Sequence, residues 1–202
     1  MPQLPVFDLT ARRDLALTLV VGRRESGKTA LVQRLLQEGA SMEGVLVDRT
    51  NASGERLRAF IEGRREAVRR GANGDGEIPR HLYRRLVVDD LSASMLKRPG
   101  FLAALEDVAA NHRHYGLDVV LVAQSFTSVP PTVRALVNYV AITSCLGEGE
   151  VRHIHDTYVG DDACSFDTFL SVAGPGLWVN DTSPNSLSLL CQLHDQRLRS
   201  AL

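Results

Sequence analysis

The residues with the clearest chemical meaning form a short polar loop, GRRESGKT, at residues 22–29. An apolar run, LALTLVV, precedes the loop, and apolar residues at helical spacing follow it. The loop fits the pattern GxxxxGK[ST], in which backbone amides and the next helix N-terminus surround a phosphate group. The sequence therefore predicts a phosphate-binding loop, the Walker A motif, between a buried strand and a helix.

Each position of this loop has an expected part in binding a nucleotide. Gly22 and Gly27 are expected to take backbone angles that a side chain forbids. Lys28 is expected to reach the β- and γ-phosphates, and the hydroxyl of Thr29 to ligate Mg²⁺. The predicted nucleotide-binding residues are Gly22, Arg24, Glu25, Ser26, Gly27, Lys28 and Thr29. The alternatives are a flexible surface loop for the whole motif, and mere solvation for the two arginines, at 23 and 24, inside it.

Three polar residues end two further apolar runs. In LVVDD (residues 86–90), Asp89 is expected to hold Mg²⁺ through water, and Asp90 to act as general base for an attacking water. Gln124 follows DVVLVA (118–123), where its amide can contact a γ-phosphate or orient that water. A strand end capped by solvated aspartates is the alternative for the pair. Taken alone, Gln124 is more simply explained as a residue leaving its strand.

These motifs require a sheet whose strands end at a common edge. Short continuous apolar runs predict strands at 15–21, 44–48, 86–90, 118–123 and 139–143. Helical spacing predicts helices at 28–37, 55–70, 100–114, 132–137, 148–158 and 163–172, and residues 176–180 and 187–193 predict a terminal hairpin. Continuous apolar strands that alternate with helices are typical of a parallel sheet covered on both faces. The predicted fold is therefore α/β, a P-loop NTPase with a doubly wound, mainly parallel sheet.

Composition bounds the class of protein. The chain has 202 residues, 44% of them hydrophobic, and fits one domain over 1–202. The formal net charge is −1, so any contact with DNA must be local. Three cysteines without a CxxC spacing argue against a disulfide framework and a cysteine zinc site. Residues 1–14 lack a signal pattern, and no apolar run reaches the ~18 residues of a membrane span. We expect an intracellular protein without a transmembrane segment.

The segment NHRHYGLDVVLVAQSFTSVPPTVRALVNYVAI, at 111–142, resembles the FtsK–HerA superfamily of DNA-pumping ATPases. In that superfamily a basic residue and a glycine precede the fourth strand, a glutamine ends it, and an Arg/Asn-bearing helix follows. The small size, the DD pair and the stretch PPTVRALVN look most like the genome-packaging ATPases of membrane-containing icosahedral double-stranded DNA viruses, such as poxviruses and tectivirus-like phages. The resemblance covers a core of about 15–145, and a helix-plus-hairpin extension of about 146–202 follows.

The resemblance implies an ATPase that couples hydrolysis of Mg²⁺-bound ATP to translocation of double-stranded DNA. Its subunits would form a homo-oligomeric ring, pentamer or hexamer, with ATP between neighbours and an arginine of one subunit completing the next site. Arg113, at the family's basic position, is favoured over Arg134 for this role. The alternative for either is a surface arginine, or one paired with a local acid such as Asp107 or Asp118.

The resemblance also implies partners. These are the backbone of double-stranded DNA, without sequence preference, and the capsid-vertex or membrane proteins of a virion. The expected location is the host cytoplasm, with incorporation at the packaging vertex of the virion as a further expectation. One predicted helix carries an arginine cluster that could grip DNA, although a solvated charged face is the favoured interpretation: Arg56, Arg58, Arg64, Arg65, Arg69 and Arg70.

Other classes of function share parts of this pattern. A cellular FtsK–HerA-type translocase or conjugation ATPase uses the same chemistry but usually carries large extra domains. A small-molecule or nucleotide kinase is often of this length, although no arginine-rich lid follows a third helix. A nucleotide-bound ring component without turnover is the non-enzyme alternative. The guanine-binding pattern NKxD does not occur in the sequence, which argues against a GTPase.

Overall fold

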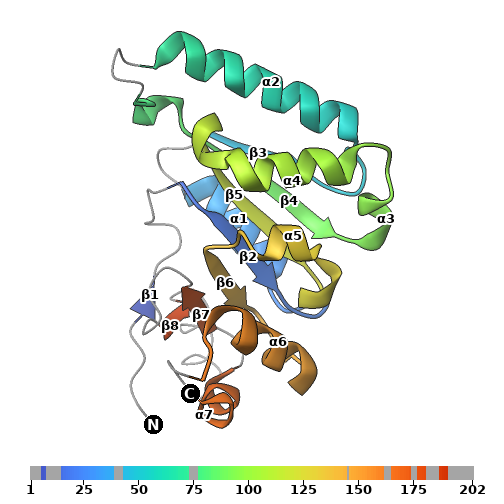
Figure 1. The fold of residues 1–202 in the computed structure, drawn as a ribbon, viewed down its shortest axis with the longest axis vertical. Helices are drawn as coiled ribbons and strands as arrows, with labels where there is room; N and C mark the ends of the chain where they lie inside the picture. Colours follow the sequence, from blue (N-terminus) through green and yellow to red (C-terminus); the bar gives the residue numbers. More distant parts are fainter. Residues whose placement is uncertain are drawn as a thin grey trace.

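The computed structural model describes residues 6–7, 15–38, 43–72, 77–144, 146–161, 165–173, 177–180 and 187–190. Within these residues one sheet has the strand order β1-β8-β7-β6-β2-β5-β4-β3 (Figure 1). The strands are β1 (Val6–Phe7), β2 (Leu17–Val21), β3 (Glu43–Val47), β4 (Arg84–Leu91), β5 (Leu117–Ala123), β6 (Tyr139–Ile142), β7 (Leu177–Asn180) and β8 (Leu187–Leu190). The five strands from β6 to β3 run parallel, and β7 joins β6 antiparallel.

Helices connect and cover these strands. The α-helices are α1 (Lys28–Glu38), α2 (Gly54–Gly71), α3 (Ala93–Leu96), α4 (Phe101–Asn111), α5 (Pro131–Arg134), α6 (Glu148–Tyr158) and α7 (Phe166–Val172). Three short 3₁₀ turns are η1 (Arg80–Leu82), η2 (His112–Tyr115) and η3 (Phe126–Ser128). Among the described residues, no helix combines the length and the apolar character that crossing a membrane requires.

Both faces of the sheet are buried at β2. Successive residues of a strand point to opposite sides, and Leu19 and Val20 are both fully buried. Leu19 of β2 belongs to a large apolar cluster with residues of α2 and α4, including Leu57 and Leu105. Its neighbour Val20 belongs to a second cluster with Leu31 of α1. Figure 1 accordingly shows α2, α4 and α5 over one face of the sheet and α1 behind the other. The predicted doubly wound α/β arrangement is confirmed.

The strand order positions the motifs. β5 lies between β2, which leads into the Gly22–Thr29 loop, and β4, which carries the two aspartates. Since these strands are parallel, all of their carboxyl ends lie at one edge of the sheet. β7 and β8 pair antiparallel, which confirms the predicted terminal hairpin, whose predicted residues 176 and 191–193 lie outside the described residues. The division into a core of about 15–145 and an extension of about 146–202 stays a prediction.

Two predicted elements differ from the structure for physical reasons. The strand predicted at 86–90 begins at Arg84, because Arg85 is buried with its Nε donating to Asp118 Oδ2 at 2.7 Å. The helix predicted at 100–114 ends at Asn111, and η2 follows. Arg64 of α2 donates to the carbonyl of Tyr115, so a tertiary contact holds this turn away from helical geometry. The short elements β1 and α3 were not predicted, since two to four residues show no periodicity.

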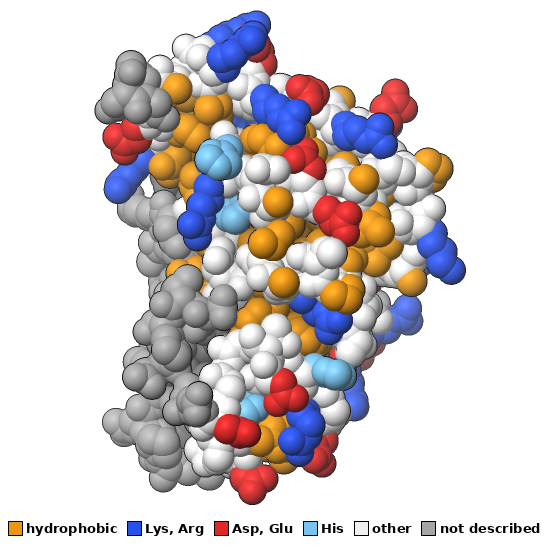
Figure 2. Space-filling model, viewed as in Figure 1, with side chains coloured by type: hydrophobic (Ala, Val, Ile, Leu, Met, Phe, Trp, Pro, Cys, Tyr) orange, Lys and Arg blue, Asp and Glu red, His pale blue; other side chains and the backbone are white. Residues whose placement is uncertain are grey.

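The arginine cluster on α2 is largely engaged within the chain. Arg64 is buried and donates to backbone carbonyls, and Arg65 pairs with Glu62 and Asp107. The arginines at 69 and 70 both pair with one acid, Glu66. Figure 2 shows basic and acidic side chains interspersed over α2 and α4 on the visible face. This pattern fits the solvated charged face, the favoured interpretation of these arginines, better than a band of free cations that grips DNA.

Candidate active site

The loop after β2 folds as the sequence pattern requires, but the reason for glycine at position 22 differs from the predicted one. Gly27 has φ 84, in the left-handed region, and its carbonyl accepts from Leu31 N at 2.9 Å at the start of α1. Glu25 also has a positive φ, 61, which is uncommon for a residue with a side chain. Gly22, in contrast, does not have a positive φ. The prediction that its backbone angle requires glycine is therefore wrong.

Close contact explains Gly22 instead. A Cβ added there would lie 2.1 Å from the hydroxyl oxygen of Thr143 and 2.7 Å from that of Ser26. Both distances are shorter than Cβ contacts normally are, so a side chain at this position would displace one of these hydroxyls or the loop itself. The loop is thus packed directly against the residues that follow β6.

Lys28 lies at the centre of the loop and is bonded to it. Its Nζ donates to the carbonyls of Gly22 and Arg23, each at 2.5 Å, and lies 3.5 Å from Ser26 Oγ. Burial lowers the pKa of Lys28 below its ordinary value, and the nearby carboxylates of Asp89 and Asp90 oppose that shift. The ammonium group therefore sits partly desolvated among acceptors, where an incoming anion would be strongly favoured.

The two aspartates end β4 at a bulge. The register between β4 and β5 shifts between Val88 and Leu91, so Asp89 and Asp90 together oppose one residue of β5. Asp90 has φ 53, a left-handed angle that strains the backbone of a residue with a side chain. Its N–H donates to Asp89 Oδ1 at 2.9 Å. Burial raises the pKa of Asp89 above its ordinary value, so its charged form is held at a cost.

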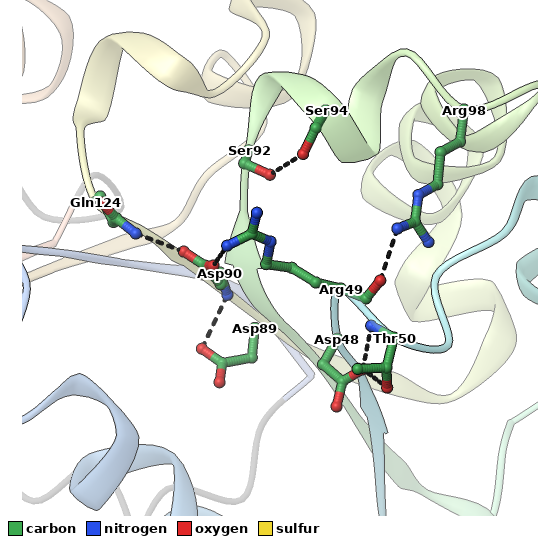
Figure 3. A network of polar contacts seen from close by, with 9 residues as sticks. All are labelled: Asp48, Arg49, Thr50, Asp89, Asp90, Ser92, Ser94, Arg98 and Gln124. Atoms are coloured by element: carbon green, nitrogen blue, oxygen red, sulfur yellow. Dashed lines mark hydrogen bonds and ion pairs between the residues drawn. The ribbon is translucent and has the colours of Figure 1, made fainter.

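Two side chains from other elements hold the Asp90 carboxylate (Figure 3). Gln124 Nε2 donates to Asp90 Oδ1 at 2.7 Å, and Arg49 Nη1 donates to Asp90 Oδ2 at 3.3 Å. Gln124, directly after β5, was predicted to lie here. Arg49, two residues after the end of β3, was not predicted, although it directly follows the strand predicted at 44–48. Each oxygen of a carboxylate has two lone pairs, so Asp90 keeps acceptor capacity for a water.

A tight turn fixes the position of Arg49. Asp48 Oδ1 accepts from the N–H and hydroxyl of Thr50, at 2.8 and 2.6 Å, and from Asn51 N at 3.2 Å. Arg98, before α4, donates to the carbonyl of Arg49 at 2.6 Å (Figure 3). The backbone at this residue is therefore tied down, while its side chain remains 57% exposed and reaches Asp90.

A cavity of about 510 Å³ brings together the two aspartates, Gln124 and every predicted nucleotide-binding residue except Gly22. Its lining is Arg24, Glu25, Ser26, Gly27, Lys28, Thr29, Asp89, Asp90 and Gln124. A hydroxyl from Thr29 and a carboxylate from Asp89 thus face the same space, and oxygen ligands of this kind suit Mg²⁺. A second cavity of about 300 Å³ shares Arg24, Asp90 and Gln124 with the first and adds Arg49. No cluster of three or more His, Cys, Asp or Glu side chains suited to a metal occurs in the described part of the chain.

The two arginines proposed to act on a neighbour lie outside this cavity. Arg113 is exposed on η2, before the amino end of β5, and lines a separate cavity of about 300 Å³. No ion pair of Arg113 is found within the described residues, and the two acids considered for it pair with other arginines, at 65 and 85. Arg134 is half-buried, with its guanidinium 4.9 Å from the centre of the Phe126 ring.

The chain is similar to known proteins in structure, although no sequence comparison finds a match. No protein-family model and no curated sequence matches the chain. A solved structure that is similar is the genome packaging NTPase B204 from Sulfolobus turreted icosahedral virus 2 in complex with AMPPCP. It has a TM-score of 0.59 and 13% identity over 87% of this chain and 97% of that one. B204 from Sulfolobus turreted icosahedral virus gives a TM-score of 0.55 at 12% identity, over 83% and 92% of the chains.

A secretion protein is similar to almost the same degree. The cytoplasmic domain of the Type VII secretion ATPase EccC from Thermomonospora curvata gives a TM-score of 0.54 at 16% identity. This match covers 86% of the present chain but only 25% of the EccC chain. At these identities the likeness is one of fold, and it agrees with the predicted P-loop fold.

Asp89→Asn should change the pH dependence of stability. Because the pKa of Asp89 is raised on folding, the folded state keeps its proton more tightly than the unfolded state. The free energy of unfolding should therefore fall as pH rises from the ordinary aspartate range through the raised pKa. The asparagine side chain does not ionise, so the variant keeps the free energy of unfolding that the wild type loses. We expect its Tm at pH 7 to be higher by on the order of 1–2 °C, measured by thermal melts from pH 3 to 8.

Asp48→Asn is the matched control. Hydrogen bonds from Thr50 lower the pKa of Asp48, so its contribution to stability appears above the ordinary range and is lost as pH falls. This variant should melt lower at pH 7. Equal pH profiles for the wild type and Asp89→Asn would contradict the burial argument.

Proposed function

We propose that this chain is an ATP-hydrolysing motor that translocates double-stranded DNA and packages a viral genome into a preformed capsid. The observation that carries the proposal is that the phosphate loop, two aspartates and a strand-end glutamine line one cavity. The fold shared with a viral genome-packaging NTPase supports the choice of process. B204 was obtained with AMPPCP and with ATP-gammaS, and binding of ATP is proposed here by analogy.

The loop residues would bind the triphosphate. Lys28 exchanges its contacts with the loop carbonyls for the β- and γ-phosphate oxygens, which carry more charge. Thr29 and Asp89 would hold Mg²⁺, Asp89 through water. When bound, that ion offsets phosphate charge and orients the γ-phosphate for transfer.

Asp90 is proposed as the general base. Its carboxylate accepts a proton from a water that attacks the γ-phosphorus in line with the departing ADP oxygen, giving ADP and inorganic phosphate. Gln124 and Arg49 fix the orientation of this carboxylate through one bond to each oxygen. Gln124 lines the same cavity, so its amide can also contact the γ-phosphate.

Arg113 is proposed to complete the site of a neighbouring subunit. It precedes β5, whereas Gln124 follows that strand, so seven strand residues, roughly 23 Å, separate it from its own cavity. Arg134 remains the alternative, but its guanidinium is packed on Phe126. A homo-oligomeric ring, pentamer or hexamer, would place each Arg113 against the next ATP, where it stabilises charge on the transferring phosphoryl group.

The remaining parts of the proposal concern partners. DNA contacts are proposed to be to the backbone, since packaging tolerates every sequence. The ring would act in the host cytoplasm at a capsid vertex, with vertex or membrane proteins of the virion as docking partners. A cellular FtsK–HerA-type translocase is the second candidate, and the similar fold of EccC, a secretion ATPase, supports a cellular role of this fold outside viral packaging.

ATP hydrolysis by purified protein tests this function. We expect turnover to rise more than linearly with protein concentration, because a trans arginine requires a neighbour. We expect a further rise, about threefold or more, with double-stranded DNA of any sequence, in line with backbone contacts. Turnover that is linear in protein and indifferent to DNA would contradict the motor. Phosphorylation of a nucleoside or sugar acceptor would instead indicate a kinase.

Asp90→Asn should separate binding from turnover. Asparagine tolerates the left-handed backbone of this position and keeps a similar shape, but it cannot take a proton. We expect kcat to fall about 10²–10⁴-fold while the Kd for ATP changes less than about threefold. Asp167→Asn, at an exposed position of α7, should leave both unchanged. An unaffected rate would remove Asp90 from the role of base.

Arg113→Ala should be rescued by mixing with Asp90→Asn. Each variant alone is expected to lose turnover by about 10³-fold. Arg113→Ala lacks the arginine supplied to a neighbour, and Asp90→Asn lacks the general base. In mixed rings the intact cavity of an Arg113→Ala subunit can receive Arg113 from an Asp90→Asn neighbour. Activity should therefore return in the mixture. Arg134→Ala serves as control and should retain most turnover. Loss in Arg134→Ala with a normal Arg113→Ala would reverse the assignment.

A further inference from the structure

The residues after β6 touch the phosphate loop through two neighbouring hydroxyls that the sequence patterns did not single out. Thr143 Oγ1 lies 2.7 Å from Ser26 Oγ, and Ser144 Oγ accepts from Arg23 N at 2.8 Å. Thr143 is only 3% exposed, so its hydroxyl has little access to water. A hydroxyl buried in this way is expected to be hydrogen-bonded within the protein.

The geometry fixes the direction of these hydrogen bonds. Thr143 Oγ1 also lies 3.1 Å from the carbonyl oxygen of Val21, which can only accept. A threonine hydroxyl has one proton, so Thr143 donates to Val21 and must accept from Ser26. Ser26 then offers only lone pairs to Lys28 Nζ, which lies 3.5 Å from its oxygen. One directed chain results, from Lys28 through Ser26 and Thr143 to Val21.

Close packing makes this contact specific. A Cβ at residue 22 would lie only 2.1 Å from Thr143 Oγ1, too close for both atoms to stay in place. The first glycine of the motif is therefore required by the threonine against which it packs. Thr143 N also donates to Val21 O at 2.9 Å, so the residue is attached to the end of β2 by both backbone and side chain.

We propose that Thr143 is a positioning residue for the phosphate-binding loop. Its hydroxyl orients Ser26, and through Ser26 it sets the loop and the Lys28 ammonium for the β- and γ-phosphates. This role rests on the proposed function, because it presupposes that the loop binds a nucleoside triphosphate. It adds β6 to the elements that form the site.

Four variants test the proposal by direct measurement of nucleotide binding: Thr143→Val, Thr143→Ser, Ser26→Ala, and Ser26→Ala combined with Thr143→Val. Thr143→Val keeps the shape but removes the hydroxyl, and Thr143→Ser keeps the hydroxyl. We expect Thr143→Val to weaken ATP binding about 3–10-fold, the value of one hydrogen bond, and Thr143→Ser to restore it. Affinity for AMP, which lacks the β- and γ-phosphates, should change less than about twofold. Ser26→Ala combined with Thr143→Val should bind ATP no more weakly than either alone, since both break one chain.

The outcomes are separable. If the wild type binds no ATP, the proposed function fails and the positioning role fails with it. If the wild type binds ATP and Thr143→Val binds it equally well, only the positioning role is overturned. Equal weakening for ATP and AMP together with a lower Tm would show a merely structural residue, and would also overturn the proposal.

Discussion

The parallel direction of five adjacent strands is the constraint on which the candidate site depends. The register pairs Val21 with Ala123 on one side and with Ile142 on the other. The next residues, Gly22, Gln124 and Thr143, therefore leave the sheet side by side. β4 adds the aspartates at the same edge. Reversing any one strand would move its polar end by the length of that strand, roughly 15–25 Å, and dissolve the cavity.

The same edge concentrates groups that do not favour folding by themselves. Burial shifts the pKa of Lys28 down and that of Asp89 up, so both charged forms are partly desolvated. Asp90 and Glu25 have left-handed backbone angles that cost energy. The apolar clusters on the two faces of the sheet offset these costs elsewhere. Such a concentration of strain and desolvated charge is typical of a functional site rather than of a structural edge.

Local patterns could predict the part of the site that lies within single segments. The glycine loop, the aspartate pair and Gln124 each follow an apolar run, and residues 24–29 of the loop line one cavity with the other three residues. Arg49 follows the strand predicted at 44–48, and Thr143 is the last residue of the strand predicted at 139–143, but their partners are 41 and 117 residues away in sequence. Their importance depends on which strands are neighbours, and periodicity does not contain that information. For the same reason the end of the helix predicted at 100–114, set by Arg64 from another helix, could not be predicted.

Charge explains why the proposed trans arginine should dock only on a loaded site. The residues lining the two adjoining cavities include three cations, Arg24, Lys28 and Arg49, and three carboxylates, Glu25, Asp89 and Asp90. These charges are formally balanced, so a fourth cation from a neighbour would enter without a counter-charge and lose solvation. A bound triphosphate supplies several negative charges at that point. In the proposed ring, entry of Arg113 would therefore be favourable with ATP in place and unfavourable without it, which would link subunit contact to the nucleotide state through electrostatics.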